Sequence, residues 1–161
     1  MTPEVLQLEG LRQQIQDLQE EINKEVGIVE YGQPEPKPTP KVNKLREQSR
    51  QARAELRNAV ESIRQSKPVA ITEWINYHKG FLEPIQTETS TAMNADSRRT
   101  FAGFCLQQWE KVAAGEQEFV YINEHFLKDY NTEVRNRAPK ILAPQDLELQ
   151  KDSKPWWQFW K

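Results

Sequence analysis

Apolar residues near the start of the chain recur at alternating intervals of three and four positions. They are Leu8, Leu11, Ile15, Leu18 and Ile22. This spacing places all five on one seam of a slightly underwound helix, as in a coiled coil. About two and a half heptads are marginal as an isolated helix in water. We therefore expect residues 1–26 to form a heptad helix whose five seam residues bind a partner helix.

A proline-rich stretch follows this helix. Gly27 and Gly32 weaken the helix end, and proline then occupies every second position of QPEPKPTPK up to Pro40. Proline lacks the amide donor that a helix needs and disfavours helical backbone in the residue before it. Residues 27–40 are thus predicted to form an extended spacer. A docking site for a proline-recognising domain is the sharper alternative.

Residues 41–67 repeat the heptad spacing and predict a second helix. Its seam comprises Val42, Leu45, Ser49, Ala52, Leu56, Ala59 and Ile63. Its surface carries a basic stripe formed by Arg46, Arg50, Arg53, Arg57 and Arg64. A solvated helix face explains the stripe most simply. Nucleic-acid binding is disfavoured, because glutamates interrupt the arginines and no aromatic residues lie between them.

The charges of the two heptad helices are opposite. Residues 1–40 contain eight acidic and three basic side chains, whereas residues 41–69 contain eight basic and three acidic ones. Pairing of the two helices in a hairpin would bury both seams and bring opposite charges together. Self-association through the first helix, which would give a coiled-coil homo-oligomer, is the alternative.

From residue 70 the apolar positions widen from a seam to a broad face, which is typical of helices that pack into a core. The first such face carries Ile71, Trp74, Ile75, His78 and Leu82. Thr72 is the expected N-cap of this helix, and Pro84 is expected to end it. Ten of the fifteen aromatic residues lie between Trp74 and Tyr130, so we expect the core in residues 70–137.

Two more helices are predicted in this region. A polar loop over residues 86–96 precedes the first of them, which Asp96 or Ser97 can cap and which pauses at Gly115. Its apolar face carries Phe101, Phe104, Cys105, Trp109 and Val112, and that of the next helix carries Phe119, Ile122, Phe126, Tyr130 and Val134. No strand pattern of useful length is present. The predicted fold class is all-α.

Composition argues against catalysis. The chain has 161 residues, enough for one domain, with only 37% hydrophobic residues and a net charge of −2. His78 and His125 stand without suitable neighbours in the sequence, and no zinc, phosphate-loop or dinucleotide motif is present. The lone Cys105 is expected to be a small core residue. We therefore expect no enzyme activity, no metal and no cofactor.

The end of the chain carries the most specific feature. Residues 138–161 are predicted to form an extended connector and a Trp-rich tail, whose aromatic residues are Trp156, Trp157, Phe159 and Trp160. Such an apolar group marks a contact, either with a groove on a protein partner or with a membrane interface. Folding back onto the chain's own helices is the third alternative.

Together these patterns predict a non-enzymatic adaptor or assembly protein. Its partner is expected to be another protein or a larger complex, bound through the heptad seams and the tail. A peripheral membrane protein anchored by the tail, or a nucleic-acid-binding protein that uses the basic stripe, are the alternatives. One unpaired cysteine and the lack of a signal-peptide pattern predict a cytoplasmic location, with peripheral membrane contact if the tail is an anchor.

Overall fold

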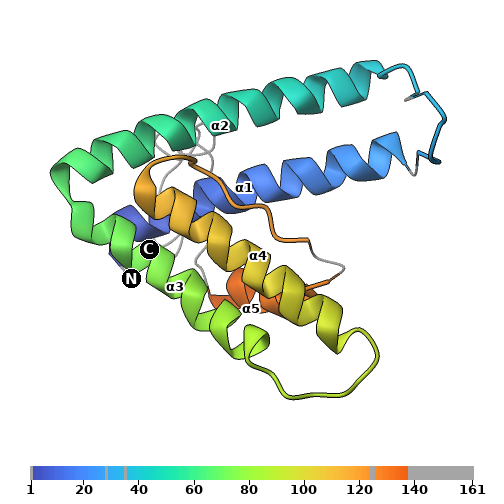
Figure 1. The fold of residues 1–161 in the computed structure, drawn as a ribbon. Coiled ribbons are helices and arrows are strands. Elements are labelled where there is room, and N and C mark those ends of the chain that lie inside the picture. Colours follow the sequence, from blue (N-terminus) through green and yellow to red (C-terminus); the bar gives the residue numbers. More distant parts are fainter. Residues whose placement is uncertain (1, 28, 35, 124–125, 138–161) are drawn as a thin grey trace, which may run out of the picture.

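A computed structural model describes residues 2–27, 29–34, 36–123 and 126–137 (Figure 1). Within these residues the chain forms five helices and no strand, which confirms the all-α prediction. The helices are α1 (Pro3–Val26), α2 (Pro40–Ser66), α3 (Pro68–Gln86), α4 (Ala95–Ala114) and α5 (Lys128–Arg137).

The helices are arranged as two hairpins that diverge from a common corner (Figure 1). Helices α1 and α2 run antiparallel in one hairpin, and α3 and α4 run antiparallel in the other. Lys67 forms the corner, because it is the only residue between α2 and α3. After α4 the chain crosses back over α1 before it enters α5 (Figure 1). Helix α1 therefore contacts both its hairpin partner α2 and the second hairpin.

The first two helices begin with the same kind of N-cap, a threonine followed by a proline. The hydroxyl of Thr2 accepts a hydrogen bond from the amide of Val5, and Thr39 caps Val42 in the same way. A proline follows each cap, at a position where its missing amide costs no helical hydrogen bond. These caps explain why α1 and α2 begin within two residues of the predicted starts.

The core is shared by both hairpins, so its predicted confinement to residues 70–137 was wrong. Apolar side chains of α1 and α2 belong to the same buried cluster as those of α3, α4 and α5. Its members include Val5, Leu8, Ile15, Leu56, Ile63, Trp74, Cys105, Trp109, Leu127 and Val134. The reason is that α1 is covered on two sides, by α2 and by the second hairpin.

The predicted ends of α3 were also wrong. The helix begins at Pro68 instead of being capped by Thr72, and it continues through Pro84 to Gln86. Pro68 fits the first helical turn because the amide at that position has no helical partner. Asn94 precedes α4 with a left-handed φ of 74° and makes no side-chain cap, so neither Asp96 nor Ser97 is its cap.

A single helix from Phe119 to Val134 was predicted, but the structure divides this region. Residues 117–123 have no helical structure, and α5 begins only at Lys128. The side-chain amide of Gln16 holds the extended part, because it donates to the carbonyl of Ile122 (2.5 Å) and accepts from the amide of the same residue (3.0 Å). This double hydrogen bond takes the place of helical bonding at Ile122.

The predicted seam residues lie inside the molecule. Leu8, Leu11, Ile15 and Ile22 are buried and Leu18 is half-buried, with α2 alongside. Near the tip of the hairpin, Lys41 Nζ pairs with Glu25 Oε1 at 2.6 Å, a link between the basic and the acidic helix. None of the helices in the described part of the chain is long and apolar enough to cross a membrane.

Two glycines provide a matched test of the turn after α4. Gly115 ends that helix with a left-handed φ of 79°, whereas Gly80 lies inside α3 with open space around it. We expect Gly115→Ala to lower the free energy of unfolding by about 1 kcal/mol, and Gly80→Ala to raise it by about 0.5–1 kcal/mol. Urea denaturation checks both. If both substitutions changed the free energy of unfolding in the same direction, this result would contradict the left-handed turn assigned to Gly115.

Candidate functional site

A buried carboxylate lies where α1 meets α3. Glu9 is 1% exposed and accepts four hydrogen bonds. Its Oε1 accepts from Arg12 Nε (3.0 Å) and Arg12 Nη2 (2.9 Å), and its Oε2 accepts from Trp74 Nε1 (2.8 Å) and His78 Nε2 (2.5 Å). Four donors fill the lone-pair positions of a carboxylate. The charge of Glu9 is therefore fully solvated by protein groups.

His78 links this carboxylate to the other helices. Its ring stacks on Trp109 of α4 with centroids 4.2 Å apart and an interplanar angle of 15°. Its Nδ1 is in hydrogen-bond contact with the hydroxyl of Tyr130 in α5. Because ionised Glu9 can only accept, Nε2 of His78 carries the hydrogen and Nδ1 accepts from Tyr130. The buried network thus joins α1, α3, α4 and α5.

The pKa values in the network follow from burial and charge. Burial would raise the pKa of Glu9, but the Arg12 charge and the hydrogen bonds from His78 and Arg12 outweigh it and hold that pKa at about 2. Burial lowers the pKa of His78, against the opposing attraction of Glu9. Burial also raises the pKa of Tyr130, which keeps its hydroxyl protonated. The network therefore contains one anion, one cation and a neutral imidazole.

The prediction that His78 has no suitable neighbours was wrong, because Glu9 is close in space although 69 positions away in sequence. The network is closed, however: His78 and Arg12 are each 0% exposed. Burial raises the pKa of the Cys105 thiol to about 12, and the residue is buried as expected. His125 lies outside the described residues. Within them, no group of three His, Cys, Asp or Glu side chains is placed to hold a metal ion.

Sequence reasoning missed the polar members of this network on α1. A second row, parallel to the leucine seam and with the same alternating spacing, consists of Val5, Glu9, Arg12 and Gln16, all buried. The signal was this repeated spacing. It could not be recognised because residues with charged or amide side chains are expected on a solvated face.

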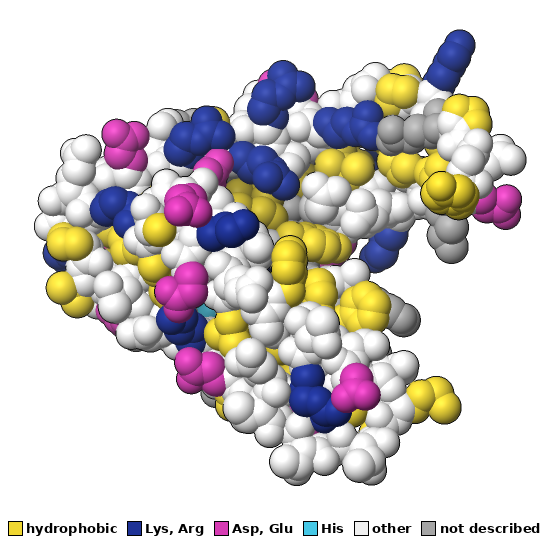
Figure 2. Space-filling model, in the orientation of Figure 1, with side chains coloured by type: hydrophobic (Ala, Val, Ile, Leu, Met, Phe, Trp, Pro, Cys, Tyr) yellow, Lys and Arg dark blue, Asp and Glu magenta, His cyan; other side chains and the backbone are white. Residues whose placement is uncertain are grey.

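An open groove lies between α2 and α4, with the extended part of the chain after α4 forming its floor. Its volume is about 370 Å³. Hydrophobic side chains gather in the notch between the two hairpins (Figure 2). We call this site the aromatic groove; its lining residues are Arg53, Phe101, Phe104, Gln108, Gln117, Phe119, Val120, Tyr121 and Asn123.

A row of three phenylalanine rings lies at the groove. Phe101 stacks between Phe104 and Phe126, with centroid distances of 6.2 and 5.6 Å. Phe104 is 52% exposed and Phe126 is 40% exposed. Phe104 was expected on the core face of α4, but the buried face instead carries Ala102, Cys105, Trp109 and Val112. Their spacing places Phe104 on the neighbouring, outward side of the helix.

The basic stripe of α2 makes contacts within the chain. Arg64 donates to the carbonyls of Val112 and Ala113 at the end of α4, as a cation does at the negative end of a helix. Arg57 pairs with Glu118 at 3.0 Å, and the guanidinium carbon of Arg53 lies 5.1 Å from the ring centroid of Phe119. Two arginines thus hold the chain segment that follows α4, and Arg64 holds the end of α4 itself.

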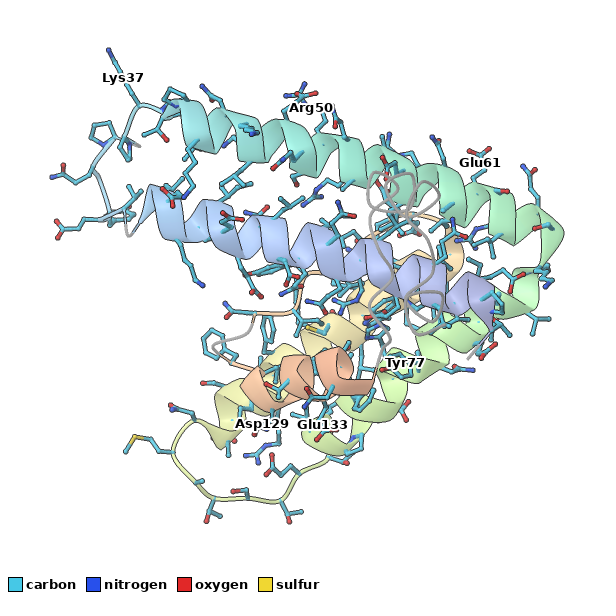
Figure 3. The ribbon with its side chains drawn as sticks, turned by 180° about the vertical axis from the view of Figure 1, so that it is seen from behind. Lys37, Arg50, Glu61, Tyr77, Asp129 and Glu133 are labelled. Atoms are coloured by element: carbon cyan, nitrogen blue, oxygen red, sulfur yellow. The ribbon has the colours of Figure 1, made fainter. Side chains whose placement is uncertain are left out.

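The other two arginines of the stripe lie elsewhere. Arg50 pairs with Glu47 and points away from α1 on the outer side of α2 (Figure 3). Arg46 lines a second cavity of about 370 Å³ between the far ends of α1 and α2, together with Gln19, Ile22, Asn23, Val26, Gly27 and Ser49. The five arginines of the stripe therefore make different local contacts and do not act as one surface.

The predicted tail residues Trp156, Trp157, Phe159 and Trp160 lie outside the described residues, so their role stays a prediction. Comparison of the chain with protein-family models, with curated proteins and with solved structures finds no match.

Two Glu–Arg pairs of the same spacing test the energetic role of burial. Glu9–Arg12 and Glu47–Arg50 both join residues three apart at 2.9 Å, but only the first is buried. We expect Glu9→Ala or Arg12→Ala to cost about 3–5 kcal/mol of unfolding free energy, because each leaves a buried charge unpaired. The exposed pair should contribute less than about 1 kcal/mol.

A double-mutant cycle by urea denaturation at neutral pH measures this difference. The double variant Glu9→Ala/Arg12→Ala should lose less than the two single variants together, since it leaves neither charge unpaired. Additive losses at the buried pair, or losses no larger than those at Glu47 and Arg50, would show that the buried pair has no special role.

The same network predicts loss of stability in acid. Folding lowers the pKa of His78 from its ordinary value of 6.5 and the pKa of Glu9 from its ordinary value of 4.5. Once the pH falls below each ordinary value, the unfolded chain binds a proton at that group more readily than the folded chain does, so stability falls. The shift at Glu9 corresponds to about 3 kcal/mol, lost as the pH falls toward 2.

Thermal melting across this pH range should therefore show a falling melting temperature below pH 6.5, with a further fall below pH 4.5. Glu9→Gln should make the fall of the melting temperature below pH 4.5 less steep, whereas Glu110→Gln, at an exposed carboxylate, should not. An unchanged slope below pH 4.5 in Glu9→Gln would argue against this assignment.

Proposed function

We propose that this chain is a non-enzymatic adaptor or assembly protein that binds a protein partner through the aromatic groove. The observation that carries the proposal is the row of Phe104, Phe101 and Phe126 beside a groove lined by further aromatic residues. Large apolar side chains in contact with water are costly, and a group of them commonly marks a protein interface.

The surroundings of the groove also favour a protein ligand. Interfaces are rich in aromatic residues and arginine, surrounded by polar side chains. Here Arg53 and the amides of Gln108 and Gln117 line the groove beside the phenylalanines. Buried Leu8, Leu11 and Ile15 lie in the chain's own core, so the proposal assigns partner binding to the groove and not to the heptad seam.

None of the three alternative functions has comparable support. Nucleic-acid binding would use the basic stripe, but Arg53 and Arg57 are engaged with the segment after α4, and Arg64 is engaged with the end of α4. Catalysis by His78 or Glu9 would need access to a substrate, and both side chains are buried with their polar atoms bonded to other groups of the chain. Membrane anchoring rests only on the tail, which lies outside the described residues.

Affinity capture with the tagged full-length chain in its native source tests this proposal. Replacement of Phe104 by Ser should lower the recovery of the partner by tenfold or more, roughly the effect of removing one aromatic interface anchor. Met93→Ser is the matched control, because Met93 is an apolar residue that is 92% exposed on the loop before α4. Equal recovery by wild type and Phe104→Ser would refute the role of the groove.

A further inference from the structure

The aromatic groove is sized for a few side chains. Its volume of about 370 Å³ lies near the lower end of the range for ligand pockets, about 300–1,000 Å³. A whole helix would not fit, but one or two flat rings would. The groove is open to solvent, since Phe104 in its lining is half exposed.

We propose that the chain's own C-terminal aromatic segment, residues 154–161, occupies this groove. The inference rests on the proposed function in one respect, that the groove is a binding surface. It adds the occupant: the segment covers the groove until a partner displaces it. The rings available are those of Trp156, Trp157, Phe159 and Trp160.

The length of the chain permits this contact. The described part ends at Arg137, and residues 138–153 connect it to the aromatic segment. An extended chain spans about 3.3–3.6 Å per residue, so this connector can reach over about 50 Å. The longest helix, α2, has 27 residues and is therefore about 40 Å long. The connector can thus reach the groove from the end of α5.

The covalent connection favours this occupant over a free ligand. A group attached through a short linker has an effective concentration of about the millimolar range at a site that the linker can span. A separate protein at lower concentration must compete with that value. Docking with a dissociation constant of about 0.1 mM would therefore keep about nine-tenths of the grooves covered, and a partner would need an affinity high enough to displace the segment.

The chemistry of the segment matches the groove. Tryptophan combines a large apolar ring with one N–H donor, and the side-chain oxygens of Gln108 and Gln117 are acceptors of the kind that this donor needs. Phe101 and Phe104 provide ring faces and edges for aromatic packing. Arg53 already lies over Phe119, and a guanidinium binds the face of tryptophan better than that of phenylalanine.

Photo-crosslinking in the purified full-length chain tests the proposal. Gln108 is replaced by p-benzoylphenylalanine, which keeps Phe104 in place, and the same replacement at exposed Met93 is the control. We expect irradiation to link position 108 to the peptide 152–161 within one chain. Trypsin releases that peptide intact after Lys151, because Lys154 is followed by proline. Phe104→Ser in the same chain should lower the yield tenfold or more.

Each result decides the proposal. A crosslink between two chains would assign the groove to a second copy, and no crosslink from position 108 or from a second probe at Gln117 would show that the segment does not dock; both overturn the inference. If the crosslink is absent but Phe104→Ser still loses the partner, only this inference fails. If the crosslink forms but Phe104→Ser retains the partner, the proposed function fails instead.

Discussion

The carboxylate of Glu9 is the group on which the rest of the structure depends. A buried charge is tolerated only when nearby groups replace water, and here Arg12, Trp74 and His78 supply four hydrogen bonds to it. Leucine side chains would tolerate a shift of α1 along its neighbours, but this carboxylate would lose the two donors that α3 supplies, Trp74 and His78. The network therefore selects one register between α1 and α3, and through Tyr130 it also positions α5.

Fixing α1 in this way also shapes the surface. Gln16 lies two turns beyond Glu9 on the same row and holds Ile122, so the segment after α4 takes its place from α1. From α2, Arg57 pairs with Glu118 in this segment, and Arg64 donates to a carbonyl at the end of α4. The aromatic groove is thus built where three separate elements converge, and its floor depends on polar contacts with the first hairpin.

Local sequence patterns were sufficient to predict the all-α fold and the starts of α1 and α2, because caps, prolines and apolar spacing act over a few residues. They were insufficient wherever a distant partner decides the outcome. Glu9 is buried only because Trp74 and His78 approach it from 65 and 69 positions away. The apolar residues from Phe119 onward fitted a helix, yet contacts with α1 and α2 keep the first of them extended.

The hydrogen bonds that occupy His78 and Glu9 also limit what these two residues can do chemically. A histidine beside a carboxylate resembles an acid–base pair, but a catalytic base must be within hydrogen-bond reach of its substrate. Both ring nitrogens of His78 are engaged, and Trp109 covers one face of the ring. Exchanging a proton with a substrate would require breaking contacts that join four helices. The groups available to a ligand are instead those that the network leaves at the surface, the phenylalanines of α4 and the segment that follows it.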